Sequence, residues 1–166
     1  MSEKVVQLME KFGGAPHSKR SLRLWLRLLS CTTLIEKRLR NNLTTQFDST
    51  LPRFDILAAL TRNPAGLTMG ELSRQLLVSN GNVTGVVGKL VDDGLVERTR
   101  SPSDGRTFFV RLTRKGHRAF KEMARAHEAW IDEAFADLGN DEIDQLTDLL
   151  ARVIMSARTG NEDRND

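Results

Sequence analysis

Two short helices joined by a tight turn are predicted in the middle of the chain, and this pair constrains the fold more than any other feature. Thr68 and Glu71 have the spacing of a capping box, so a helix should begin after Thr68 and end near Leu76. Ser79 is a preferred helix cap. The valines and the leucine that follow it keep a helical period, so a second helix should run to Asp93.

The periodicity of apolar residues then changes to 2, which is typical of strands. We expect strands at 95–100 and 107–112, because residues 101–105, SPSDG, have strong turn chemistry. A helix-turn-helix followed directly by a hairpin is a winged helix-turn-helix, in which the hairpin forms the wing. The chain is therefore predicted to be mainly α, with a small β-hairpin wing.

Further helices are predicted on the amino-terminal side of this region. A short one should cover residues 3–12 and stop at the glycine pair that follows. A long one should run from about Lys19 to Phe47, where apolar residues keep helical spacing. Pro52, a favoured first-turn residue, should open another helix that ends before Asn63.

Two helices are also predicted on the carboxyl-terminal side. Thr113 should cap a helix that runs to about Leu138. Asn140 should cap the last helix, whose first turn holds acidic residues that favour the helix dipole. The residues from about Thr159 are typical of a disordered tail.

Charge is distributed unevenly along the chain, although the net charge is only +3. Residues 52–118 hold eleven basic residues against six acidic ones, whereas residues 119–166 hold five against twelve. A basic middle predicts a polyanionic partner, while pairing between the two ends is an alternative for part of the asymmetry. No apolar run approaches the roughly 20 residues of a membrane span, and a single cysteine excludes an internal disulfide. We therefore expect a cytoplasmic protein with no membrane contact.

The second helix of the pair carries three glycines, Gly81, Gly85 and Gly88, which we call the glycine face. Each costs about 1 kcal/mol of helix stability relative to alanine. At 100° per residue they lie opposite the valines and the leucine that should pack on the preceding helix. A bare outward face would let the backbone approach base edges in a DNA major groove. The alternative is a poorly formed helix end or a close helix–helix contact.

Polar residues that can read DNA flank the glycine face. Asparagine can pair with adenine, the threonine methyl group can contact thymine, and Lys89 can contact a phosphate or a guanine. At the wing tip Arg106 can enter a narrow minor groove, with Asp104 either orienting it or only forming the turn. The predicted DNA-binding residues are Ser79, Asn80, Gly81, Asn82, Thr84, Gly85, Lys89, Arg98, Asp104 and Arg106.

The segment GLTMGELSRQLLVSNGNVTGVVGKLVDDGLVERTRSPSDGRTFFVRLTRKG resembles the winged-helix signature of the MarR family of bacterial transcriptional regulators. The resemblance extends over roughly residues 20–155 and includes the Asp104-x-Arg106 pair. It implies a homodimer with interlocking terminal helices that binds a pseudo-palindromic site on double-stranded DNA. It also implies release by a small ligand, bound between the dimerisation helices and the winged helix.

The resemblance divides the chain into four predicted parts. The amino-terminal helices (1–50) would serve dimerisation and form one wall of the effector pocket. The winged helix-turn-helix (51–112) would bind DNA, the next helices (113–158) would complete the dimer, and a disordered tail (159–166) would follow.

Two features depart from the family pattern. Leu77 occupies the turn where the family motif often has glycine. The glycine face replaces side chains that many relatives use for base contacts. We therefore expect few base contacts from this helix and more reliance on Arg106 and on DNA shape.

The first long helix carries the prediction about the effector. Arg20, Arg23 and Arg27 form a cationic stripe with no acid within one turn, so an anion from elsewhere should neutralise it. Solvation, or pairing with the acidic carboxyl-terminal helices, is the alternative. Trp25 and Phe54 could wall an aromatic site, although core packing is their commoner role.

A further resemblance suggests the chemistry of that effector. The segments LRLWLRLLSCTTLIEKRLR and LPRFDILAAL also look like MarR regulators of aromatic-acid catabolism. This implies an aromatic acid or its CoA thioester as effector.

The sequence therefore predicts a ligand-responsive transcriptional regulator in the repressor role. An enzyme is not expected, since no nucleophile–base pair or phosphate-binding loop is visible. No metal or resident cofactor is expected either, because the three histidines lack ligand spacing. Two alternatives remain: a winged helix that serves only protein–protein contacts, and a regulator that senses oxidation through Cys31. We expect that cysteine to be buried among apolar residues and inert.

Overall fold

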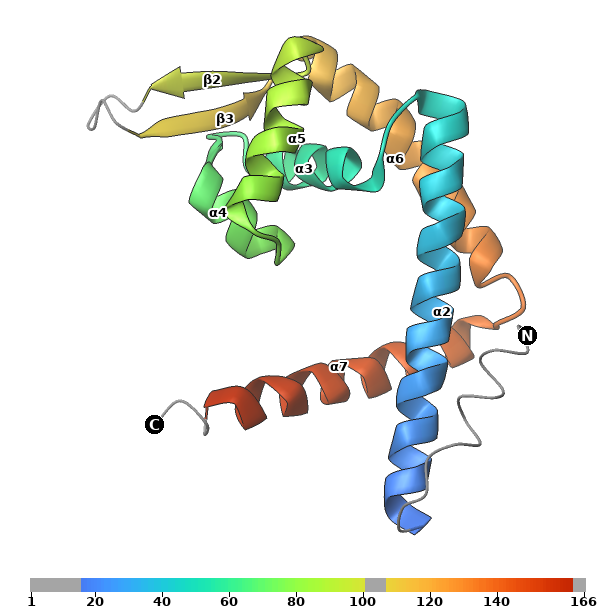
Figure 1. Ribbon diagram of the computed structural model, residues 1–166. Helices are drawn as coiled ribbons and strands as arrows, with labels where there is room; N and C mark the ends of the chain where they lie inside the picture. The colour runs from blue at the N-terminus through green and yellow to red at the C-terminus, as the bar shows by residue number, and fades with distance from the viewer. Residues whose placement is uncertain (1–15, 101–106, 163–166) are drawn as a thin grey trace. The chain divides into compact units, whose positions relative to one another are not determined.

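The computed structural model describes the backbone of residues 16–100 and 107–162 and the side chains of 19–100 and 107–157. The chain is mainly helical with a small antiparallel sheet (Figure 1). It divides into two compact units, and the division falls between Glu128 and Ala129, inside a helix. No helix in the described ranges is long and apolar enough to cross a membrane. The helix predicted at the amino terminus falls outside those ranges.

The long amino-terminal helix, α2 (Pro16–Phe47), is followed by α3 (Leu51–Arg62), as predicted. Only the end of α2 contributes to the core of the first unit, through Leu39 and Leu43. None of the side chains of residues 19–38 is buried. The apolar spacing of α2 therefore predicted the helix correctly, but not which surface it packs against.

The helix-turn-helix consists of α4 (Met69–Leu76) and α5 (Asn80–Asp92). Its capping box is present, since the Thr68 backbone N–H donates to the Glu71 carboxylate at 2.8 Å and the Glu71 backbone N–H donates to the Thr68 hydroxyl at 3.3 Å. The hydroxyl of Ser79 accepts a hydrogen bond from a backbone N–H in the first turn of α5. Both capping predictions are confirmed.

The turn between α4 and α5 adopts the left-handed geometry that favours glycine, although Leu77 occupies it. Leu77 has φ 54° and ψ 37°, and its N–H donates to the carbonyl of Ser73. The Ser73 hydroxyl donates to the carbonyl of Val78 at 2.6 Å, and the N–H of Val78 donates to the carbonyl of Ser73 at 3.2 Å. These hydrogen bonds hold a conformation that costs an ordinary residue about 1–2 kcal/mol.

The wing belongs to a three-stranded antiparallel sheet rather than to a hairpin alone. β2 (Val96–Arg100) pairs with β3 (Phe108–Leu112), as predicted, and β3 also pairs with β1 (Leu67–Thr68), giving the order β1-β3-β2. The sequence carries no signal for β1, because two residues are too few to show alternation. The turn predicted at 101–105 is not among the described residues.

The helix α6 (Arg114–Ala134) begins after Thr113, as predicted. The Thr113 hydroxyl accepts a hydrogen bond from the backbone N–H of Gly116 at 3.0 Å. A Cβ at Gly116 would lie 2.0 Å from the carbonyl oxygen of Leu95, which no side chain could tolerate. Glycine at this position therefore lets α6 start directly against the segment that leads into the wing.

The ends of the carboxyl-terminal helices differ from the prediction. α6 ends at Ala134 rather than near Leu138, and a turn follows Ala134 directly. α7 (Asn140–Glu162) includes Asn140 as its first residue, so the predicted cap is wrong. Gly139 takes that position, and its N–H donates to the carboxylate of Glu142 at 2.9 Å. α7 also extends into the segment predicted as a disordered tail.

The core of the first unit is built around α3. Its residues Ile56, Leu57 and Leu60 are at most 2% exposed. The Phe54 ring stacks on the His127 imidazole of α6, with centroids 4.6 Å apart. α3 therefore connects the helix-turn-helix on one side with α6 on the other.

The left-handed Leu77 provides a test of the turn. Replacing Leu77 by glycine should stabilise the protein by about 1 kcal/mol, because the backbone strain is removed and part of the gain is lost to the more flexible unfolded chain. Little burial is lost, since Leu77 is 92% exposed. The free energy of unfolding in urea measures the effect.

The neighbouring Val78→Gly variant is the matched control. Val78 is also exposed but has an ordinary backbone conformation, so this variant should lose stability. A loss of stability in Leu77→Gly as well would show that the turn is unstrained.

Candidate nucleic-acid interface and adjoining pocket

The helix α5 has one packed side and one bare side. Its packed side is formed by Val83, Val87 and Leu90, each at most 1% exposed. A Cβ added at any residue of the glycine face would meet nothing within 4 Å in the described part of the chain. The glycines therefore do not serve a helix–helix contact there, and the unbroken helix from Asn80 to Asp92 shows that they do not mark a helix end.

The predicted cap and the polar residues predicted to flank the glycine face are all exposed: Ser79, Asn80, Asn82, Thr84 and Lys89. The hydroxyl of Ser79 is engaged in the helix cap. The hydroxyl of Thr84 donates to the carbonyl of Asn80 at 2.9 Å, which leaves its methyl group for an apolar contact. The amides of Asn80 and Asn82 and the ammonium of Lys89 are the groups that can read base edges or phosphates.

The arginines of the wing have different surroundings. Arg98 is exposed on β2. The guanidinium of Arg100 lies 5.6 Å from the centroid of a phenylalanine ring on β3, in a cation–π contact. Arg111 donates from Nε to a backbone carbonyl before β1 at 2.8 Å, which ties the wing to the loop after α3. Asp104 and Arg106 are not described, so their roles stay predictions.

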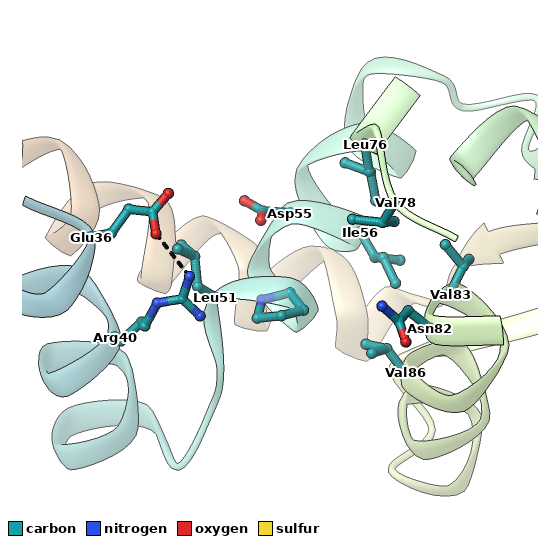
Figure 2. Close-up of a pocket in the computed structure, with 11 residues that line it drawn as sticks. Glu36, Arg40, Leu51, Asp55, Ile56, Leu76, Val78, Asn82, Val83 and Val86 are labelled. Carbon is teal, nitrogen blue, oxygen red and sulfur yellow. Dashed lines mark hydrogen bonds and ion pairs between the residues drawn. The ribbon is translucent and has the colours of Figure 1, made fainter. Parts of the chain in front are cut away.

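A pocket with a volume of about 330 Å³ adjoins α5 (Figure 2). Its lining residues come from α2, α3, the end of α4, the turn between α4 and α5, and α5 itself. Its polar lining residues are Glu36, Arg40, Asp55 and Asn82, and its apolar ones are Leu51, Pro52, Ile56, Leu76, Val78, Val83 and Val86. A small molecule in this pocket would contact both the long helix α2 and the helix that carries the glycine face.

Two of the three charged side chains that line the pocket pair with each other, and the third does not. The guanidinium of Arg40 donates to the carboxylate of Glu36 at 2.8 Å. The carboxyl of Asp55 makes no hydrogen bond or ion pair with any described residue. Burial raises the pKa of Asp55, while the charges of Arg40 and Arg62 oppose this rise and that of Glu36 adds to it. Asp55 is thus a half-buried acid without a partner.

The residues predicted to bind the effector do not line this pocket. Phe54 is 8% exposed and stacks on His127 in the core. The other four are exposed on the amino-terminal half of α2: Arg20, Arg23, Trp25 and Arg27. The structure therefore does not bring Phe54 and the arginine stripe together at the pocket, and their role in effector binding stays a prediction.

Few sequence signals pointed to the pocket residues. Glu36, Arg40 and Asp55 come from two helices, and only the packing of α2 against α3 brings them together. The one available signal was Asp55 itself, an acid in the otherwise apolar segment FDILAAL.

Cys31 is exposed, so the prediction of a buried cysteine is wrong. It lies in the part of α2 where no described side chain is buried. Apolar spacing indicates that a helix has a packing face, but it does not say whether the partner surface belongs to the same folding unit.

The sequence is similar to those of known transcriptional regulators. A model of the MarR family matches residues 47–107. The HTH-type transcriptional regulator MhqR of Bacillus subtilis is 33% identical over 88 residues, which make up 53% of this chain and 61% of MhqR. The match therefore spans less than two thirds of the length of that relative. These relatives are regulators rather than enzymes.

Solved structures share the fold over most of the chain. The crystal structure of a MarR family transcriptional regulator from Silicibacter pomeroyi has a TM-score of 0.74 and 31% identity, and the match covers 87% of this chain and 99% of that one. A mutant MarR from E. coli complexed with operator DNA has a TM-score of 0.72 and 26% identity, with 81% and 95% covered. The second of these has operator DNA bound to a protein of this fold.

The glycine face provides a direct test of the interface. Gly85→Leu should leave the protein folded and add up to about 1 kcal/mol of helix stability. It should abolish DNA binding, because a leucine side chain would hold the backbone away from the groove. Fluorescence anisotropy measures binding, with a labelled duplex selected from random sequence by the unmodified protein.

Gly70→Leu on α4 is the matched control, since a Cβ there also meets nothing within 4 Å. It should fold and bind the duplex normally. Unchanged binding by Gly85→Leu would show that the glycine face does not lie against DNA.

Proposed function

This chain belongs to the MarR family, and on that basis we propose that it is a transcriptional regulator that binds a pseudo-palindromic DNA site as a homodimer. We further propose that it acts as a repressor and is released when a small molecule binds. The observation that carries the DNA-binding role is the exposed glycine face on a helix whose opposite side is fully packed. An exposed bare face costs helix stability and serves no contact among the described residues, whereas it suits close approach to a major groove.

Exposed apolar residues on α7 support the homodimer. They form a stripe at helical spacing, with Ile143 and Leu146 37% exposed, Val153 47% and Ile154 53%. A contiguous apolar stripe of this kind indicates a contact surface. The helix α2 exposes large apolar residues as well: Leu24, Trp25, Leu29 and Leu34. A second copy of the chain would cover such surfaces, as the family resemblance implies.

The pocket supports release by a small molecule. Its walls include Arg40 of α2, a predicted dimerisation helix, and Asn82 of α5, a predicted groove-reading residue. An occupant would therefore contact both parts at once. An aromatic acid or CoA thioester as effector, a cytoplasmic location and redox sensing through the exposed Cys31 stay predictions.

The salt dependence of DNA binding tests the proposal. Each phosphate neutralised by the protein adds roughly 0.9 to the slope of log affinity against log salt concentration. We expect affinity to fall steeply with salt concentration for the unmodified protein. For Arg98→Ala the slope should be smaller in magnitude by about 0.9, because we expect that arginine to contact a phosphate. Anisotropy titrations at several salt concentrations measure both.

Arg125→Ala is the control, since Arg125 is exposed on α6 and not part of the proposed interface. Its slope should equal that of the unmodified protein. A flat slope for the unmodified protein would favour the alternative function, a winged helix that binds only other proteins.

The apolar stripe of α7 can be tested separately. Ile154→Glu should shift the protein from dimer to monomer, because the charge would have to be buried in the contact. Sedimentation equilibrium measures the dissociation constant. Gln145→Glu introduces the same charge at an exposed position on another side of α7 and should leave the dimer intact. Equal dimerisation of both variants would exclude the stripe from the interface.

A further inference from the structure

We propose that the pocket between α2, α3 and α5 binds a small organic cation with an apolar body, and that Asp55 is its counter-ion. An alkyl or arylalkyl ammonium ion has this chemistry. The inference rests on the proposed function, because it takes the pocket as the site through which the regulator is released from DNA.

The size and walls of the pocket define the body of the ligand. A volume of about 330 Å³ is at the lower end of the range for ligand pockets. It fits one ring with a short chain and is too small to enclose a CoA thioester. Leu51, Ile56, Val78 and Val86 provide apolar walls for such a ring.

The charges of the pocket indicate which charge the ligand should carry. Arg40 is the only basic residue among the described residues that line the pocket, and Glu36 already accepts its hydrogen bond at 2.8 Å. This pair is neutral as a unit and leaves Asp55 as the unmatched charge. Figure 2 shows the carboxyl of Asp55 between that pair and the apolar residues near α5. A bound cation would match Asp55, whereas a carboxylate ligand would face two carboxyls with no unpaired cation.

The state of Asp55 in the empty pocket supports the assignment. Burial raises the pKa of its carboxyl, so the ionised form is held at a cost. A cation beside it would reverse that shift. The group thus has an unfavourable environment that a bound cation relieves, which is typical of a binding residue rather than of a structural one.

The position of Asn82 connects the pocket to DNA. Asn82 lines the pocket and also lies one position after Gly81 of the glycine face. A ligand that contacts the Asn82 amide would compete with its contact to a base. Occupancy of the pocket would therefore weaken DNA binding through α5 itself.

The experiment compares three ligands of similar size on the full chain: 2-phenylethylamine, 2-phenylethanol and phenylacetate, with 3-phenylpropanoate as a second, longer carboxylate. Isothermal titration calorimetry measures binding, and anisotropy measures release of the selected duplex. We expect the ammonium ion to bind at least about tenfold more tightly than the other ligands, as for a charge-assisted contact. It should also release the duplex.

Three variants locate the binding determinant. Asp55→Asn should lose about tenfold in affinity for the ammonium ion, since the amide keeps the shape but not the charge. Arg40→Gln should bind the ammonium ion at least as well as the unmodified protein, because it removes a competing cation. Glu122→Gln, an exposed acid on α6, is the control and should change nothing.

The Asp55→Asn variant also reports on folding. Because the folded state raises the pKa of Asp55, ionisation of this carboxyl reduces stability as the pH rises through the folded pKa. The amide should therefore raise the melting temperature at neutral pH, and the difference should vanish in acid.

Affinity for the ammonium ion should fall as the pH is lowered through the raised pKa of Asp55, because protonation removes its charge. The charged groups that face this carboxyl are Glu36 and Arg40 from α2 and Arg62 from α3. Binding of phenylacetate or 3-phenylpropanoate that equals or exceeds that of the amine, or full affinity in Asp55→Asn, would overturn the assignment. Release by CoA thioesters that depends on Arg23 would do the same and would favour the anionic effector.

The outcomes separate this inference from the proposed function. Salt-dependent DNA binding without any response to the amine would overturn the pocket assignment and leave the DNA-binding regulator intact. Tight binding of the amine that depends on Asp55, in a protein that does not bind DNA, would overturn the proposed function and leave the assignment intact.

Discussion

The structure of the winged helix-turn-helix depends on the burial of one side of α5 in the core that α3 organises. Val83, Val87 and Leu90 are almost completely buried, as are Ile56 and Leu57 of α3. The ion pair between Arg53 and Asp93 adds a link from α3 to the end of α5. This burial offsets the roughly 2–3 kcal/mol that three glycines cost the helix. Without this burial, α5 would not be a stable helix and would present no bare face.

The same packing gives α5 its two functional neighbours. One side of the helix carries the glycine face, open to a groove, and the flank with Asn82 and Val86 closes the pocket. The proposed DNA surface and the proposed ligand site therefore lie on the same helix. Communication between the two sites requires no long pathway, because both use the same element.

Local signals in the sequence predicted most of the fold. The Thr68–Glu71 capping box, the Ser79 cap and the change of period after Gly94 depend on neighbours within a few residues, so they can be recognised without the fold. The predictions failed where residues that are far apart in the sequence determine the structure. β1 exists only because β3 pairs with it, and the exposure of Cys31 depends on what α2 packs against.

The sequence by itself determined the order of the helices from α2 to α7 and the bare face of α5, because helix period and capping are properties of adjacent residues. Only the tertiary structure decided that Asp55 is an unmatched acid. The charge around it depends on Glu36 and Arg40, which lie on another helix and pair with each other. Electrostatic energy depends on distance in space and on burial, and neither quantity can be obtained from spacing along the chain.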